Sequence, residues 1–198
     1  MPAFILRLIA PRPNFAQTMT ASQIPATDDR GTPQVSLVTD TIRKGDRHLL
    51  TIRVAAETSS PPDRVLDAAR DFSERRADVW PNVKVKHLEV HECGETFAEV
   101  TEGTWVVGIF WERSHYDWSQ PGLVKATVTD SSVFEPGSTW ELRATPRDGG
   151  SQVEIVLRRG FRRGPKGRIA SAVHHTVGKW VWGSFLRRAL AAVEKQAG

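Results

Sequence analysis

Residues 83–161 alternate short runs that are rich in β-branched and aromatic residues with clusters of turn residues. The runs, in order, are VKVKHLEV, TFAEVTEG, GIFWERSHYDW, LVKATVTD, TWELRATP and SQVEIVLRRGF, and the clusters between most of them are CGE, SQPG, EPGS and RDGG. Strands joined by such turns are typical of an antiparallel meander, because each turn returns the chain beside the strand before it. The pattern therefore predicts six consecutive antiparallel strands.

One further strand and three helices are predicted around this meander. HLLTIRVAAE alternates apolar and polar residues as a half-buried strand does, SSPPDRVLDAARDF has prolines at a helix start, and SERRADVWPN favours a second short helix that stops at Pro81. Over residues 165–196 the apolar positions recur at three- and four-residue steps, which predicts one long C-terminal helix. The expected fold is α+β: a curved seven-stranded antiparallel sheet, with the long helix across its apolar face enclosing a cavity.

The beginning of the chain differs in composition. Residues 11–46 are mostly Pro, Thr, Ser, Gln, Asp and Arg, so burial there could not offset the entropy lost on ordering. We predict a disordered or weakly ordered leader at 1–46 and one domain at 47–198. The early run FILRLIA is broken by Arg7 and has no small-residue cleavage site, which argues against a secretory signal and leaves Met19 as an alternative start.

Composition limits the class of protein. The chain is 39% apolar and 25% charged, and no apolar run approaches the roughly 20 residues that span a bilayer. The single cysteine, Cys93, excludes an internal disulfide framework and suits a reducing compartment, so we expect a cytoplasmic protein. A net charge of +4 permits an anionic partner without requiring one.

The elements in this order resemble the START-like, or helix-grip, superfamily, specifically its bacterial polyketide cyclase/dehydrase and lipid-transport group called SRPBCC. The residues that carry the resemblance are SSPPDRVLDAARDFSERRADVWPN, WERSHYDW, DSSVFEPGSTWEL and GGSQVEIVLRRGF…KGR before the long helix, within roughly residues 48–196. The resemblance implies a mostly apolar pocket between sheet and helix. Such pockets serve lipid carriage, sterol or quinone binding, polyketide cyclisation and hydrolysis, so the resemblance implies an architecture and no particular reaction.

IFWERSHYDW, residues 109–118, presents two different faces when it is read as a strand. One face carries Phe110, Glu112, Ser114, Tyr116 and Trp118. The other face carries Trp111, Arg113, His115 and Asp117. Apolar bulk favours the first face toward the cavity.

The following turn favours the opposite orientation. Pro121 and Gly122 suit the middle of a two-residue loop, which would pair His115 with Val128 and turn the second face toward the interior. We prefer the aromatic face inward and keep Arg113 and His115 as the alternative.

With the aromatic face inward, Glu112, Ser114 and Tyr116 become polar groups in an apolar pocket. A buried Glu112 would have a raised pKa suited to proton transfer or to hydrogen-bonding a ligand hydroxyl, whereas an arginine on a neighbouring strand would make it a structural ion pair. The candidate catalytic residues are Glu112, Tyr116 and Arg113. The predicted cavity residues are Phe110, Glu112, Ser114, Tyr116, Trp118, Trp140, Leu142, Val173, Val177 and Trp180.

Two other groups of residues suggest ligands. His87, Glu89, His91 and Cys93 alternate along one predicted strand, but His87 and His91 would lie about 13 Å apart, so we expect a solvated face and no metal or other cofactor. The run RRGFRRGPKGR holds six cations before the long helix, where an acidic head group, an anionic membrane surface or nucleic acid could bind, or where the loop is simply solvated. Nucleic acid is disfavoured because stacking aromatics are nearly absent. The cations are Arg158, Arg159, Arg162, Arg163, Lys166 and Arg168.

The apolar stripe of the last helix changes side near Gly183. At 100° per residue one cluster contains Ile169, Val173, Val177, Trp180 and Val181, and a nearly opposite cluster contains Trp182, Phe185, Leu186, Ala189, Leu190 and Val193. Either the helix bends at Gly178 or Gly183, or its last turns bury against something other than the cavity. We place the first cluster, with Trp180, toward the cavity.

The leading functional prediction is binding, with or without transport, of a hydrophobic small molecule such as a lipid, isoprenoid or polyketide. The first alternative is an aromatase/cyclase-type enzyme in the same cavity, and the second is an adaptor that binds anionic surfaces through the basic run. The sequence leaves open whether the protein is an enzyme and what its oligomeric state is.

Overall fold

The computed structural model describes residues 49–106 and 108–196, so the predicted leader at 1–46 lies outside the described residues. The elements are, in chain order, β1 (Leu50–Thr58), α1 (Pro62–Arg70), α2 (Arg76–Val79), the 3₁₀ turn η1 (Val85–His87), β2 (Glu89–Cys93), β3 (Phe97–Val106), β4 (Gly108–Asp117), β5 (Leu123–Ser131), β6 (Thr139–Arg147), β7 (Gly150–Arg159), α3 (Pro165–Thr176) and α4 (Gly178–Lys195).

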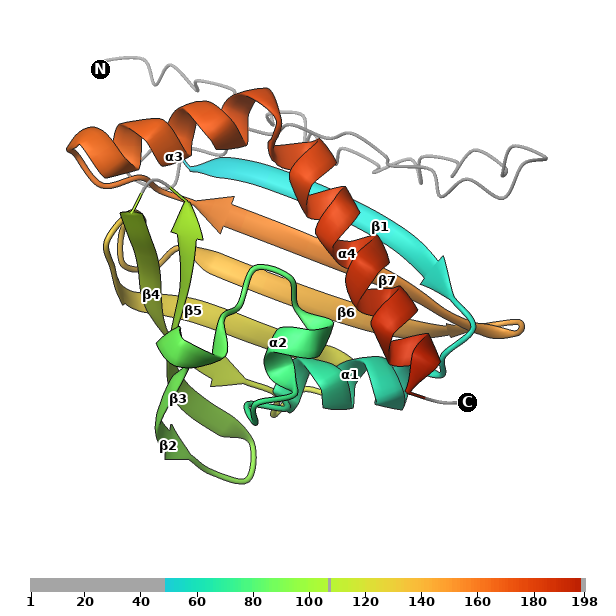
Figure 1. Ribbon diagram of the computed structural model, residues 1–198. Helices are drawn as coiled ribbons and strands as arrows, with labels where there is room; N and C mark the ends of the chain where they lie inside the picture. The colour runs from blue at the N-terminus through green and yellow to red at the C-terminus, as the bar shows by residue number, and fades with distance from the viewer. Residues whose placement is uncertain (1–48, 107, 197–198) are drawn as a thin grey trace, which may run out of the picture. The chain divides into compact units, whose positions relative to one another are not determined.

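The strands form one antiparallel sheet in the order β1-β7-β6-β5-β4-β3-β2 (Figure 1). Strands β2 to β6 each pair with the next strand along the chain, and β1 pairs with β7 from Leu50 opposite Arg159 to Thr58 opposite Ser151. The predicted α+β architecture with a seven-stranded antiparallel sheet is therefore confirmed.

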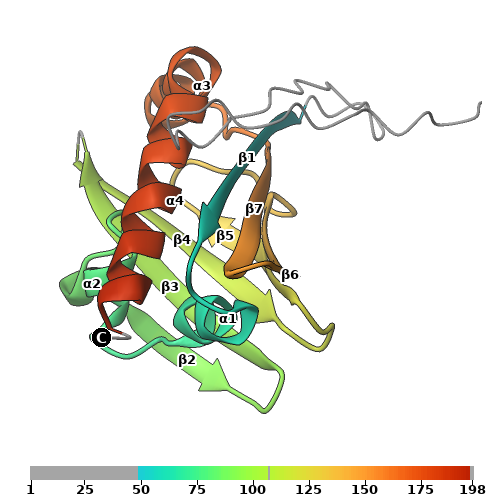
Figure 2. The same cartoon turned by 90° about the vertical axis from the view of Figure 1, so that its right-hand side faces the viewer.

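The helices lie on one side of the sheet (Figures 1 and 2). Helix α4 packs against β1, with α3 at its first turns and α1 and α2 near its last. Because β-strand side chains alternate, one sheet face supplies Leu142, Ile155 and Leu157 to a core completed by Leu186 and Leu190 of α4. The space between sheet and α4 is the place where the fold can hold a site.

The predicted single C-terminal helix is two helices with a junction at Val177 and Gly178. Val177 has φ −119° and ψ 4°, which is outside the helical region. A Cβ on Gly178 would lie 2.7 Å from Ile52 Cδ1, so glycine lets the junction approach β1. The bend at Gly178 was one of the two alternatives that the stripe allowed.

The first strand of the predicted meander is shorter than expected. Residues 83–88 contain the turn η1, and β2 begins only at Glu89. This edge strand is exposed throughout and its register shifts between Val90 and Glu92. Val90 is 43% exposed, so neither face of this strand is buried.

Candidate functional site

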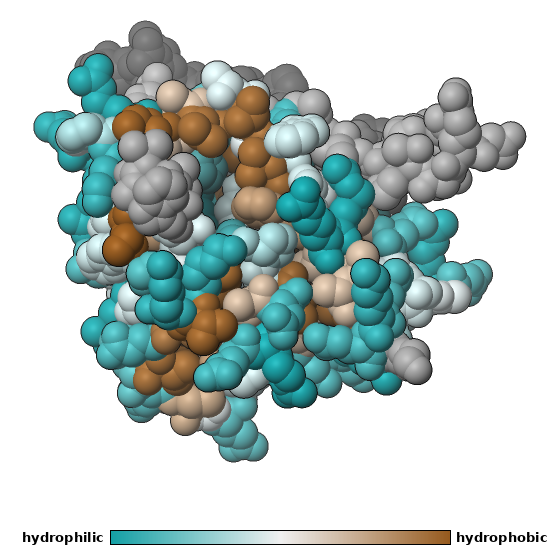
Figure 3. Space-filling model, in the orientation of Figure 1, coloured by the Kyte–Doolittle hydropathy of each residue, from teal (hydrophilic) through white to brown (hydrophobic). Residues whose placement is uncertain are grey.

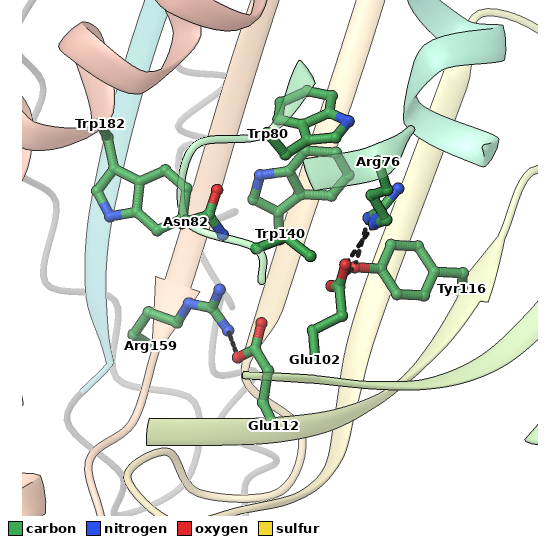
Figure 4. A pocket seen from close by; sticks show the side chains of 10 residues that line it. Arg76, Trp80, Asn82, Glu102, Glu112, Tyr116, Trp140, Arg159 and Trp182 are labelled. Carbon is green, nitrogen blue, oxygen red and sulfur yellow. Dashed lines mark hydrogen bonds and ion pairs between the residues drawn. The ribbon is translucent and has the colours of Figure 1, made fainter. Parts of the chain in front are cut away.

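A cavity of about 30 Å³ lies between the inner face of the sheet and the helices (Figure 4). Its lining comes from α2 and the loop after it, from four strands and from α4. The lining residues are Arg76, Trp80, Asn82, Val83, Glu102, Glu112, Tyr116, Trp140, Arg159 and Trp182. Four of these side chains are charged and three are tryptophans, so the expectation of a mostly apolar pocket is wrong.

One buried cluster joins α2 to two strands. Arg76 Nε donates to Glu102 Oε1, Arg76 Nη2 donates to Tyr116 Oη at 3.1 Å, and Tyr116 Oη donates to Glu102 Oε2 at 2.5 Å. Arg76 Nη1 also donates to the carbonyl of Ala69 at 3.0 Å, which fixes the guanidinium at the end of α1. These bonds satisfy both charges, as a buried ion pair requires.

The environment of Tyr116 keeps its hydroxyl protonated. The residue is 4% exposed, and burial raises the pKa of Tyr116 well above its ordinary value, with the adjacent Glu102 carboxylate raising it further. Tyr116 therefore acts as a neutral hydrogen-bond donor inside the cluster.

A second ion pair lies beside the first. Arg159 Nη1 donates to Glu112 Oε2 at 3.1 Å, and the guanidinium covers the ring of Phe134 at 4.4 Å from its centroid. Arg159 is 2% exposed, whereas the Glu112 side chain keeps 23% of its surface because it lines the cavity. Burial raises the pKa of Glu112 above its ordinary value, against the opposing charge of Arg159.

The two ion pairs are coupled through the sheet. Glu102 on β3 and Glu112 on β4 are directly opposite each other, so like charges face each other across the strands. The negative charge of Glu102 contributes to the raised pKa of Glu112. Each carboxylate is neutralised by its own arginine, from α2 for Glu102 and from β7 for Glu112.

Three tryptophans form the apolar wall of the cavity. Trp80 and Trp140 meet edge to face with ring centroids 5.8 Å apart. Trp182 of α4 donates its Nε1–H to His174 Nε2 at 3.5 Å, and His174 Nδ1 donates to the carbonyl of Ala170 at 2.8 Å. The wall on the α4 side is therefore linked to α3.

His174 is neutral in this arrangement. Burial, with a smaller contribution from the positive charge of Arg159, lowers the pKa of His174 to about 4 against the opposing effect of the bond to the Ala170 carbonyl. A neutral ring with its proton on Nδ1 leaves Nε2 free to accept from Trp182.

Two polar atoms of the cavity have no hydrogen-bond partner among the described residues. They are Asn82 Oδ1, an acceptor, and Arg159 Nε, a donor. A buried polar atom without a partner costs about 1–3 kcal/mol, so each favours a bound group that satisfies it.

Comparison with protein-family models and with curated proteins finds no match to this sequence. Solved structures do match: the Zhui aromatase/cyclase from Streptomyces has 18% identity and a TM-score of 0.61 over 76% of this chain and 97% of that chain. A Thermus thermophilus protein has 15% identity and a TM-score of 0.63 over 75% and 99%, and a START superfamily protein from Mycobacterium smegmatis has 10% identity and 0.55 over 74% and 95%. The chain shares with these proteins a helix-grip fold, in which a curved antiparallel sheet packs against a C-terminal helix.

The helix-grip sheet turns the aromatic face of β4 inward. Ser114 is 1% exposed and Tyr116 4%, whereas Arg113 is exposed and His115 bonds Glu99 at 2.7 Å on the outer face. The preferred orientation of this strand holds, and the alternative with Arg113 and His115 inward is wrong.

The two-residue loop that argued for that alternative is also wrong. Gly122 has φ 75° and Leu123 N bonds the carbonyl of Gln120 at 3.3 Å, so a turn does form around Pro121. Strand pairing nevertheless ends at Asp117 opposite Lys125, and the longer connection shifts the register by one residue.

The predicted cavity residues separate into three groups. Glu112, Tyr116 and Trp140 line the cavity, while Ser114 and Leu142 are buried outside its lining and Phe110 and Trp118 are half-buried. The remaining three are wrong, because they lie on the outer side of α3 and the start of α4: Val173 is 41%, Val177 45% and Trp180 72% exposed.

The basic run does not form one site. Arg159 points into the cavity, Arg158 bonds Glu141 at 2.7 Å and Arg162 pairs with Asp130. The other members, Arg163, Lys166 and Arg168, are exposed.

Sequence reasoning placed Arg159 on the surface and missed six other lining residues: Arg76, Trp80, Asn82, Val83, Glu102 and Trp182. Alternation contained the signal for two of them. Glu102 continues the inward face of Ala98 and Val100, and Arg159 continues the face of Leu157 and Ile155. Nothing local marks Arg76, whose partners come from distant strands.

Proposed function

We propose that the protein binds a small, largely apolar molecule bearing hydroxyl or carbonyl groups, of the polyketide class, between the sheet and α4. The observation that carries this proposal is the pair of unpartnered atoms, Asn82 Oδ1 and Arg159 Nε, in a cavity walled by tryptophans. Flat aromatic walls with a few polar groups are typical of sites for such molecules. The charged and amide side chains that line the cavity favour an oxygenated ligand over a plain lipid or isoprenoid chain.

Binding requires the cavity to widen. Its volume of about 30 Å³ is far below the ~300–1,000 Å³ of sites for drug-sized ligands. The movable wall in this proposal is Trp182, whose indole is held to His174 only by a long hydrogen bond of 3.5 Å. A change of Trp182 rotamer would open the space above Glu112 and Arg159.

Titration of the protein's tryptophan fluorescence with alizarin, a hydroxylated anthraquinone, tests this proposal, with anthracene as the oxygen-free comparison. We expect tighter binding of alizarin and a loss of at least about tenfold in Glu112→Gln, since one hydrogen bond to a charged group contributes about 1.5–3 kcal/mol. The matched control is Glu141→Gln, which alters the Glu141–Arg158 pair outside the cavity. Equal affinity for both probes, with no effect of Glu112→Gln, would contradict the proposal.

A second candidate function is cyclisation of a poly-β-ketone in the same cavity. It is favoured by the raised pKa of Glu112 beside Arg159, because such a carboxyl exchanges protons closer to neutral pH. Glu112 would take a proton from a carbon next to a carbonyl, and Arg159 would stabilise the enolate oxygen. The enolate carbon would then bond to a second carbonyl carbon, whose oxygen takes the proton back from Glu112. Loss of that hydroxyl as water and enolisation of the remaining ring ketones would give the aromatic product.

Turnover separates the two candidates. A cyclase would convert a short poly-β-ketone thioester to an aromatic product with new absorbance, and Glu112→Gln would lower kcat about a hundredfold or more. Product formation no faster than in buffer would exclude cyclisation while leaving ligand binding intact.

The cellular location of the protein remains a proposal. No helix of the described residues is long and apolar enough to cross a membrane. A cytoplasmic location stays a prediction that rests on the lone Cys93. The alternative of an adaptor that binds anionic surfaces depends on the basic run before α3 and not on the cavity.

A further inference from the structure

The outer side of α3 and the first turn of α4 carries a row of exposed apolar side chains. Ile169 is 41%, Val173 41%, Val177 45% and Trp180 72% exposed. Figure 3 shows hydrophobic residues gathered over α3 and its junction with α4. Single exposed apolar residues are ordinary, but a contiguous row that includes a tryptophan indicates an interaction surface. We call these four residues the apolar row.

The apolar row lies in a part of the chain that has only positive charges. No Asp or Glu occurs between Glu154 and Glu194, and this interval contains nine lysines and arginines. They are Arg158, Arg159, Arg162, Arg163, Lys166, Arg168, Lys179, Arg187 and Arg188. Arg163, Lys166 and Arg168 are exposed at the N-terminal end of the row, and Lys179 adjoins Trp180.

The surface extends from α3 to the neighbouring sheet. Lys166 Nζ donates to the carbonyl of Ile109 at 3.4 Å, and Ile109 is itself 44% exposed. The apolar row is thus continued by β4 at the end where the cations gather. Helix α3 itself contacts α4 and leaves its other side uncovered by any described element.

We propose that the apolar row, with Arg163, Lys166 and Arg168, docks on an anionic phospholipid bilayer. Trp180 and the aliphatic side chains would enter the boundary between head groups and acyl chains, where tryptophan is favoured. Each nearby cation contributes about 1 kcal/mol of attraction to an anionic lipid surface. The docking surface is separate from the cavity, so this inference stands or falls independently of the proposed ligand.

Charge complementarity favours lipid over other partners. A second copy of the chain would bring the same cations against each other, which opposes association through this face. Nucleic acid would meet the cations, but aliphatic side chains such as Val173 and Ile169 offer neither stacking nor hydrogen bonds to bases. A bilayer with anionic head groups satisfies both the apolar and the charged parts of the surface.

Flotation of the full-length protein with vesicles tests the proposal. The vesicles are phosphatidylcholine alone and phosphatidylcholine mixed with phosphatidylglycerol. We expect binding only to the mixed vesicles, and a loss of about a hundredfold in the double variant Arg163→Glu/Arg168→Glu. Unfolding of α3 would not explain this loss, because an acidic residue in the first turn of a helix is favourable.

The matched control is Arg64→Glu/Arg143→Glu, which changes the net charge equally at exposed positions away from α3. It should retain most of the binding. Equal loss in both double variants, or no binding of the unaltered protein to either vesicle, would overturn the proposal.

Insertion is distinguished from simple attraction by quenching with brominated lipid. Brominated lipid should quench the fluorescence of Trp180 in the vesicle-bound protein. The variant Trp180→Phe should still bind the vesicles, with markedly less quenching of its remaining tryptophan fluorescence. The variant Val177→Ser/Trp180→Ser should bind at least about tenfold more weakly, since it removes two exposed apolar groups. Vesicle binding without quenching of Trp180 fluorescence would contradict the docking geometry. So would a dimer in solution that forms through the apolar row.

Discussion

The inner and outer faces of β3 and β4 use the same kinds of charged residue with opposite consequences. On the inner face Glu102 and Glu112 are buried against Arg76 and Arg159. On the outer face Glu99 lies beside His115 and Arg113, whose side chains are 43% and 45% exposed. Water screens the outer charges, whereas the inner ones depend on their partners for solvation, so only the inner pairs can control the fold and a ligand.

The largest effect should come from Arg76→Met, which leaves Glu102 buried without its partner. We expect a loss of about 3–5 kcal/mol in the free energy of unfolding, since breaking a buried ion pair costs that much. Arg113→Met on the outer face is the comparison, with an expected change of at most about 1 kcal/mol. Urea denaturation of both variants measures the difference, and equal effects would abolish the contrast between the faces.

Tyr116→Phe should destabilise the inner cluster by about 1–3 kcal/mol. The substitution keeps the ring but removes the hydroxyl that donates to Glu102 and accepts from Arg76. The same urea titration measures it. A stability unchanged from the original protein would show that water or Arg76 replaces the hydroxyl.

Glu112 should make the free energy of unfolding fall as pH rises, whereas a carboxylate with a lowered pKa makes it increase. Its folded pKa is raised, so the folded state favours the protonated form, and its contribution to stability is lost as pH rises from the ordinary Glu pKa through the raised value. Relative to Glu112→Gln, the original protein should lose stability across that window. Free energies of unfolding at acidic and neutral pH check the sign, and a gain with rising pH would refute it.

The smallest effect should come from Glu99→Gln on the outer face. The bond from Glu99 to His115 is short, at 2.7 Å, but both groups reach solvent. We expect a change below about 1 kcal/mol that shrinks further in high salt. A loss as large as that of Arg76→Met would show that exposure does not separate the two faces.

Local patterns predicted the elements better than their partners. Alternation and turn residues identified the meander, because the two-residue period of a strand is set by neighbouring residues. Apolar bulk identified the inward face of β4, against the orientation that the turn at Pro121 favoured. The same alternation extends to Glu102, which was not singled out, and to Arg159, which was assigned to the basic surface run. The long C-terminal helix was recognised, but Val173 and Trp180 were placed toward the cavity and are exposed.

The sequence by itself determined the seven strands and the acid-free basic stretch between Glu154 and Glu194. The tertiary structure decided which charges meet: Arg76 reaches Glu102 across 26 positions, and Arg159 reaches Glu112 across 47. It also decided the break at Gly178, which depends on contact with Ile52 of β1. Periodicity describes one element at a time, whereas an ion pair or a helix bend follows from how elements distant in the chain pack together.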